Sequence, residues 1–156
     1  MLRKIEINNF KSFEHAEFDL KNFTLLAGRN SMGKTSVIQA IFAMIQNGKN
    51  PFRGEYMNIG KVQEVKNAIT GNGDIEFKIC YKTSEKEIEA SKVITKEGVS
   101  ESGEIDKLIN VIYCSSDRIG IEDTYKKYLG DKIIIGKNCE YVFHYLNAHD
   151  EDQMDP

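Results

Sequence analysis

Residues 28–35 read Gly28-Arg29-Asn30-Ser31-Met32-Gly33-Lys34-Thr35 and match the pattern Gly-x-x-x-x-Gly-Lys-[Ser/Thr]. The glycines of such a loop let the backbone curl, so that successive N–H groups point toward one bound anion. The lysine is a point charge that can reach the β- and γ-phosphates of a nucleotide, and the Thr35 hydroxyl can coordinate Mg²⁺. The pattern predicts a phosphate-binding loop, with a glycine turn and an incidental lysine as the alternative.

The residues on either side of this loop fit the same interpretation. Before it, residues 23–27 are apolar without alternation, which predicts a strand covered on both faces. After it, residues 34–46 are helix formers whose apolar side chains cover most of the circumference, and Asn47-Gly48 closes the predicted helix. A helix this apolar is expected to pack on several sides. The positive end of its dipole would face the loop.

The N-terminal residues predict a pair of strands. Ile5 and Ile7 alternate with polar residues, and the same alternation returns over residues 16–20. Only a short connector at residues 8–13 separates the two runs. Two strands this close in sequence are expected to be antiparallel neighbours.

Downstream of the helix the signals are weaker. Alternation over residues 75–79 and again over residues 88–90 predicts a β-hairpin. Residues 98–106 are polar and are predicted to form a loop, whereas residues 108–114 are predicted to form a buried strand. A last helix is expected over residues 141–146.

Composition limits the class of protein. The chain has 156 residues, 40% hydrophobic and 29% charged, which is typical of one globular domain and argues against wholesale disorder. Its 21 basic and 24 acidic residues give a net charge of −3, so a general polyanion binder is excluded, although a local basic patch stays possible. The longest apolar stretch, residues 37–45, contains Gln39 and is too short to span a membrane. We expect a soluble cytoplasmic protein with no membrane partner.

The cysteines agree with this compartment. Cys80, Cys114 and Cys139 are odd in number and widely spaced, without a Cys-x-x-Cys pair or a histidine at ligand spacing. A disulfide framework or a zinc site is therefore not expected, and three reduced thiols are the simpler interpretation.

Residues 1–47 also resemble a known family. Two runs carry the likeness: Ile5-x-Ile7-x-Asn9-Phe10-Lys11-Ser12-Phe13, and Leu25-x-x-Gly28-Arg29-Asn30-x-x-Gly33-Lys34-Thr35-Ser36. Together they are similar to the N-terminus of ABC-type AAA ATPases of the RecF/SMC/OLD-nuclease group. Asn30 and the connector separate this group from Ras-like or kinase-like loops. More weakly, residues 113–120 and 136–141 resemble AAA-domain relatives found in prokaryotic genome-defence systems.

This resemblance implies an α/β fold of the P-loop NTPase class. The chain would be the N-terminal lobe of an ABC-type head, with a mixed sheet and an antiparallel β layer. Residues 1–149 would form a single nucleotide-binding lobe, an incomplete ATPase head, and residues 150–156 an acidic, disordered tail.

The resemblance also implies the binding residues for ATP and Mg²⁺, with Thr35 as the metal ligand. Lys11 and Ser12 would lie near the nucleotide, the alternative being an ordinary solvated turn. Arg53 is a candidate for a phosphate- or DNA-proximal arginine and Gln63 for a metal- and water-contacting glutamine, each against a solvated side chain. The full set of nucleotide-binding candidates is Lys11, Ser12, Gly28, Arg29, Asn30, Ser31, Met32, Gly33, Lys34, Thr35 and Ser36.

The sequence departs from these relatives in its catalytic groups. They carry an Asp-Glu pair after a second apolar strand, a serine-glycine signature segment and a late histidine, and none of these is found here. Asp117-Arg118 follows residues 111–114 only after two serines, which favours a structural pattern over a relocated Mg²⁺ or water site. His144 and His149 follow no such strand. The catalytic residues are therefore unknown, and the chain resembles the first half of a head.

The function implied is ATP binding within an ATPase of DNA repair or anti-phage defence. The remainder of the head or a partner chain would complete it, two heads would form a homodimer, and a nucleic-acid or nuclease effector would lie outside these residues. This chain alone would bind ATP without efficient turnover. One alternative is a non-hydrolysing ATP sensor or scaffold. The other is a small-substrate kinase, and the β-rich residues 74–95 argue against the kinase alone.

Overall fold

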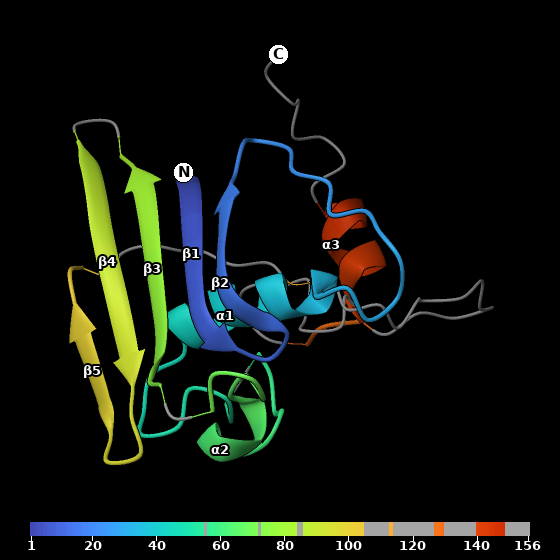
Figure 1. Ribbon diagram of the computed structural model, residues 1–156. Helices are drawn as coiled ribbons and strands as arrows, with labels where there is room; N and C mark the ends of the chain where they lie inside the picture. Colours follow the sequence, from blue (N-terminus) through green and yellow to red (C-terminus); the bar gives the residue numbers. More distant parts are fainter. Residues whose placement is uncertain are drawn as a thin grey trace. The chain divides into compact units, whose positions relative to one another are not determined.

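The computed structural model describes residues 1–54, 56–71, 73–83, 86–104, 113, 127–129 and 140–148 (Figure 1). The chain divides into two compact units, Met1–Ile109 and Asn110–Pro156, and each is described by itself. Among the described residues, the first unit contains a β-sheet and the helices α1 (Lys34–Ile45) and α2 (Val62–Val65), and the second contains helix α3 (Val142–Ala148). No helix in the described part of the chain has the length and apolar character needed to cross a membrane.

The first unit is built on a five-stranded sheet in which every pair of neighbours is antiparallel. The spatial order is β2-β1-β3-β4-β5, so the N-terminal strand lies between its sequence neighbour and a strand that comes much later. The strands are β1 (Leu2–Phe10), β2 (Phe13–Asp19), β3 (Ile75–Lys82), β4 (Glu87–Ile94) and β5 (Val99–Ser102).

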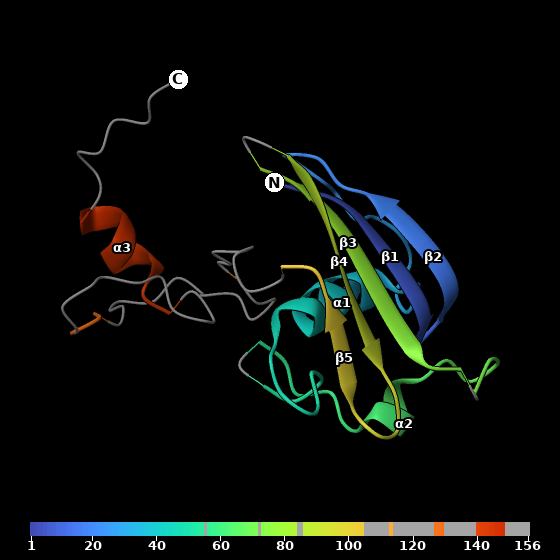
Figure 2. The same cartoon turned by 90° about the vertical axis from the view of Figure 1, so that its left-hand side faces the viewer.

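One face of this sheet forms the core. Ile5 and Ile7 of β1 are fully buried and lie opposite Ile79 and Phe77 of β3, as strict alternation requires. Helix α1, Lys34–Ile45, lies across this face (Figure 2). The helix packs against β1, the strand that leads into the connector.

A buried lysine ties the far end of α1 to the sheet. Lys92 of β4 is fully buried, and its Nζ donates to the Gln46 carbonyl at 2.8 Å and lies 2.8 Å from the Glu101 carboxylate. A buried charge is costly unless it is paired and hydrogen-bonded, and Lys92 has both kinds of partner. The helix that follows residues 28–33 is thereby fixed at its C-terminal end.

Several sequence predictions are confirmed. The β1–β2 antiparallel pair, the β3–β4 hairpin, helix α1 and a C-terminal helix all form where periodicity placed them. The antiparallel β layer is therefore present. Parallel pairing, which a mixed sheet requires, does not occur among the strands that the structure describes.

The prediction of a doubly covered strand at residues 23–27 is wrong for the described structure. No described strand pairs with this segment, and the side chains of Phe23 and Leu25 are 83% and 75% exposed. The Thr24 hydroxyl and the Lys21 backbone form a local turn instead, with Lys21 N–H donating to Thr24 Oγ1 at 3.0 Å. An apolar run becomes a strand only where neighbouring backbone supplies hydrogen bonds, and no strand among the described residues does so here.

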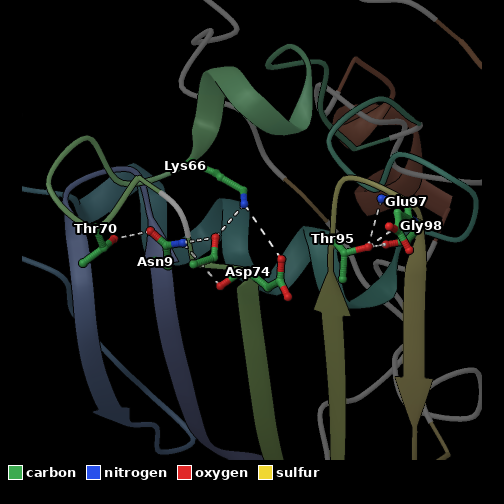
Figure 3. A network of polar contacts seen from close by, with 8 residues as sticks. Asn9, Lys66, Thr70, Asp74, Thr95, Glu97 and Gly98 are labelled. Carbon is green, nitrogen blue, oxygen red and sulfur yellow. Dashed lines mark hydrogen bonds and ion pairs between the residues drawn. The ribbon is translucent and has the colours of Figure 1, made fainter.

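The predicted loop at residues 98–106 is also wrong in part, because β5 begins there. Val99 pairs with Ile94, and the intervening turn is closed by the Thr95 Oγ1, which accepts from the N–H groups of Glu97 at 3.0 Å and Gly98 at 3.1 Å (Figure 3). β5 is a polar edge strand whose last three residues are exposed to solvent. It therefore carries no apolar alternation by which a strand could be recognised from the sequence.

The end of α1 differs from prediction as well. Gln46, not a glycine, is the C-cap and has an extended conformation. This conformation sends its amide into the next loop, where Nε2 donates to the Pro51 carbonyl at 2.6 Å and Oε1 accepts from Tyr56 N–H at 2.6 Å. The helix is also less enclosed than predicted, since Ile38 is 38% exposed.

Other predictions cannot be compared with the structure. The proposed strand at residues 108–114, apart from Tyr113, lies outside the described residues, as do the acidic residues 150–156. The same holds for Cys114, Asp117, Arg118, Cys139 and His149.

Candidate functional site

The loop before α1 has the backbone that its glycines predict. Gly28, Ser31 and Gly33 have φ angles of +147°, +65° and +89°. At Gly33 an added Cβ would lie 2.6 Å from Phe13 Cζ and 3.1 Å from Ser12 Oγ. Only glycine therefore fits there, and its missing side chain lets the connector pack directly on the loop.

The start of α1 is suited to an anion. Gly33 is the N-cap and offers no side-chain hydrogen bond, and no acidic residue lies in the first turn. The first bond back into the helix runs from Val37 N–H to the Gly33 carbonyl at 3.1 Å. Earlier N–H groups have no partner within a helix, and the dipole adds positive potential at the same point.

The loop lysine lies folded over its own loop. Lys34 Nζ donates to the carbonyls of Gly28 at 2.7 Å and Arg29 at 2.6 Å. These two acceptors are neutral, so a phosphate would be a stronger partner for the same ammonium group. Thr35, the next residue, is exposed, whereas Ser36 is buried.

The connector brings a second lysine to the loop. Lys11 Nζ donates to Gln39 Oε1 of α1 at 2.6 Å and lies 5.8 Å from the centre of the Phe10 ring. Burial lowers the pKa of the Lys11 ammonium below its ordinary value. Lys11 and Ser12 thus lie beside the loop, in the same cavity as Lys34 and Thr35.

These groups share one cavity of about 470 Å³. No carboxylate lies among the described lining residues, so Lys11 and Lys34 give the cavity a positive charge. Its lining residues are Lys11, Ser12, Asn30, Ser31, Gly33, Lys34, Thr35 and Ser36.

Some predicted site residues lie apart from this cavity. Gly28, Arg29 and Met32 do not line it, and Met32 is 67% exposed. Arg53 and Gln63 are exposed and do not line it either.

His144 lies in the second unit, in helix α3, where its Nδ1 accepts the Tyr128 N–H at 3.1 Å. The loop and the connector therefore line one cavity, whereas Arg53 and Gln63 are not among its lining residues.

A second cavity, of about 350 Å³, lies on the outer face of the sheet and is less suited to an anion. Glu6 and Glu89 line it, and Glu6 lies 3.6 Å from Lys78 Nζ. Its charges largely neutralise one another, so nothing there would attract phosphate. Among the described residues, no three His, Cys, Asp or Glu side chains gather in a way that could hold a metal ion.

Two polar residues that support the candidate site were not predicted from the sequence. Gln39 is the partner of Lys11, and its signal was the single amide within the apolar residues 37–45. Asn67 donates from Nδ2 to the Lys11 carbonyl at 2.9 Å, and nothing in its local sequence indicates this contact.

Comparison with known proteins adds the family. A family model described as the AAA ATPase domain matches residues 1–155. A search of curated proteins gives no match. The matched region includes both the loop and the connector, and the α/β architecture of the first unit fits a P-loop NTPase-like fold. Since the match covers nearly the whole sequence, the chain belongs to the AAA ATPase domain family.

Proposed function

We propose that this chain binds Mg-ATP in the cavity between the loop (residues 28–36) and the connector (residues 8–13). The observation that carries the proposal is the charge of the cavity: Lys11 and Lys34, from distant parts of the sequence, line it together with no carboxylate among its described lining residues. An AAA ATPase domain implies nucleotide use, and usually Mg²⁺. A volume of about 470 Å³ is also within the ordinary range of ligand pockets.

Each residue of the cavity has a distinct role in this proposal. Lys34 would exchange the Gly28 and Arg29 carbonyls for phosphate oxygens, while the first N–H groups of α1 bind the same phosphates. The exposed Thr35 hydroxyl fits Mg²⁺, a cation that takes one or two protein oxygens and completes its shell with water and phosphate. The ion would neutralise charge on the phosphates.

The test is equilibrium binding of Mg-ATP by titration calorimetry. Lys34→Ala is expected to weaken binding about 10- to 150-fold, because a hydrogen bond to a charged group contributes about 1.5–3 kcal/mol. Lys49→Ala is the matched control: it removes an exposed lysine just beyond the other end of α1 and should bind as the wild type does. Equal affinity in Lys34→Ala and the wild type would overturn the site assignment.

Exposed apolar side chains on either side of the loop in sequence support the proposal of a partner. Phe23 and Leu25, directly before the loop, and Ile38 of α1 expose apolar side chains. We propose that the remainder of an ATPase head, or a partner chain, covers these side chains, and that two complete heads pair as a homodimer. The resemblance of residues 1–47 to the RecF/SMC/OLD group extends the proposal to a cytoplasmic ATPase of DNA repair or anti-phage defence.

Turnover separates an ATPase lobe from a non-hydrolysing sensor or scaffold. We expect this chain alone to bind ATP and to hydrolyse it negligibly, because a missing group for charge stabilisation costs about 10³–10⁵ in rate. Steady-state phosphate release is the measurement, with Lys34→Ala as the contamination control. A rate of about 1 s⁻¹ that disappears in Lys34→Ala would contradict the need for a partner. Phosphate transfer to a small molecule would identify a kinase.

A further inference from the structure

The connector has an unusual backbone. Asn9 and Lys11, neither of them glycine, have φ angles of +54° and +51°. This left-handed conformation costs free energy for residues with a side chain, and it persists only where the surroundings hold it in place. The chain segment formed by residues 65–71 with Gly73 and Asp74, here called the brace, provides that hold.

The brace binds Asn9 through its side chain. Asn9 is 6% exposed, its Nδ2 donates to the Gly73 carbonyl and to the Asp74 carbonyl at 3.4 Å, and its Oδ1 accepts from the Thr70 hydroxyl (Figure 3). Lys66 Nζ also donates to the Gly73 carbonyl, at 2.5 Å. The amide of Asn9 is therefore fully engaged by the brace.

The brace binds Lys11 through its backbone. The Lys11 N–H donates to the Val65 carbonyl at 2.8 Å, and the Lys11 carbonyl accepts from Asn67 Nδ2 at 2.9 Å. Asn67 is 3% exposed, and its Oδ1 closes its own turn by accepting from Ile69 N–H at 2.8 Å and Thr70 N–H at 3.1 Å. The Asn67 side-chain amide thus bonds both its own turn in the brace and the backbone of the connector.

The other end of Lys11 is fixed on α1. Its Nζ donates to Gln39 Oε1, and the next residue, Ser12, lies against Gly33 of the loop. Holding the peptide of Lys11 therefore decides where both its ammonium group and the Ser12 hydroxyl meet the cavity.

We propose that Asn67 is a positioning residue of the nucleotide site, holding Lys11 and Ser12 in place for the phosphates from outside the cavity. The inference rests on the proposed function, because it concerns the same cavity. Asn67 itself does not line that cavity, so it acts on a ligand only through the connector.

The informative substitution is Asn67→Asp. The carboxylate keeps an oxygen for the N–H groups of Ile69 and Thr70 but loses the donor to the Lys11 carbonyl. Mg-ATP affinity should fall about 2- to 10-fold, the size of one lost hydrogen bond. If Asn67→Asp does not fold, Asn67→Ser also keeps a turn acceptor but is too short to reach Lys11.

Asn50→Asp is the matched control. Asn50 makes the same kind of bridge in another loop: Oδ1 accepts from Phe52 N–H at 3.0 Å and Nδ2 donates to the Gly60 carbonyl at 3.2 Å. Asn50 does not line the cavity. We expect a similar change in melting temperature and an unchanged Mg-ATP affinity. An equal loss of affinity in both variants would mean that general destabilisation is the cause.

A double-mutant cycle against the Lys11→Ala/Ser12→Ala background separates positioning from the added charge. If Asn67 acts through Lys11 and Ser12, Asn67→Asp should cause little further loss of affinity once both side chains are removed. A loss of the same size in both backgrounds would overturn the proposal, because a repulsive carboxylate acts on ATP whether or not the Lys11 and Ser12 side chains are present.

Hydrogen exchange of the Lys11 amide tests the hold without any nucleotide. Asn67→Asp should accelerate this exchange at least about tenfold while leaving Ile79, in the middle of β3, unchanged. Unchanged exchange at Lys11 would overturn the inference. Absence of ATP binding by the wild type would overturn the proposed function, and the exchange result would still decide whether Asn67 holds the connector.

Discussion

Two short segments that carry aromatic side chains, the connector (residues 8–13) and residues 23–27, differ in how far those side chains are buried. The connector carries Phe10, which is fully buried, stacked on Phe52 at a centroid distance of 5.5 Å and edge-on to Phe77 at 5.2 Å. Residues 23–27 carry Phe23, which is 83% exposed. A hydrophobic pattern indicates that side chains are suited to burial, but it does not say which surface buries them.

The difference has a consequence for the cavity. Its connector side is held by the sheet, by the brace and by packing on Gly33. The stretch before the loop has no described strand beside it. We therefore expect the connector wall of the proposed nucleotide site to be formed in this chain, and the exposed side chains of Phe23 and Leu25 to be covered by a partner.

The largest expected effect is on folding. Phe10→Ala should lower the free energy of unfolding by about 3–5 kcal/mol, because it removes a fully buried ring and leaves a cavity between Phe52 and Phe77. Urea denaturation followed by circular dichroism measures it. A loss below about 1 kcal/mol would show that the connector is not part of the core.

Gly33→Ala tests the contact between connector and loop. The new Cβ would lie 2.6 Å from Phe13 Cζ, and alanine disfavours a φ of +89°. We expect a loss of about 1–3 kcal/mol in stability together with weaker Mg-ATP binding. Thermal melting and calorimetry measure the two effects, and wild-type behaviour in both would contradict close packing of Ser12 and Phe13 on the loop.

Thr35→Ala tests the loop wall of the cavity separately from the connector wall. Its hydroxyl is the proposed Mg²⁺ ligand, so the substitution should weaken Mg-ATP binding about tenfold, or about 1.4 kcal/mol, and metal-free ATP binding much less. Titrations with and without Mg²⁺ provide the comparison. Equal losses in both would show that Thr35 acts only as a residue of the helix start.

Phe23→Ala is the counterpart of Phe10→Ala and should have the smallest effect. An exposed side chain with no buried contact changes stability by less than about 0.5 kcal/mol. The same urea denaturation of this chain is the measurement. A loss approaching that of Phe10→Ala would mean that Phe23 is buried in solution and that the predicted strand forms.

Two kinds of element could be predicted from the sequence: strands whose pairing partner is close in the chain, and segments with a clear alternation of apolar residues. β1 and β2 are joined by a connector of a few residues, and β3 and β4 alternate cleanly, so period and proximity were sufficient. β5 was missed because a solvated edge strand has no apolar face. The four-residue helix α2, Val62–Val65, was not predicted either, since one turn carries too little periodicity.

The residues of the candidate site also fall into those that the sequence predicted and those whose contacts only the fold creates. The loop at residues 28–35 is a local pattern, and family resemblance added Lys11 and Ser12. Gln39 and Asn67 lie 28 and 56 residues from Lys11, and their contacts exist only because α1 and the brace pack beside the connector. No pattern within one segment encodes such a contact.

The most direct test of the central claim, that loop and connector form one nucleotide site, is the change in amide chemical shifts of ¹⁵N-labelled protein on addition of Mg-ATP. We predict the largest shifts in residues 30–36 together with Lys11 and Ser12, and small shifts at Lys78 and Ser91, which line the outer-face cavity. Shifts concentrated at Lys78 and Ser91, with an unperturbed loop and connector, would contradict it.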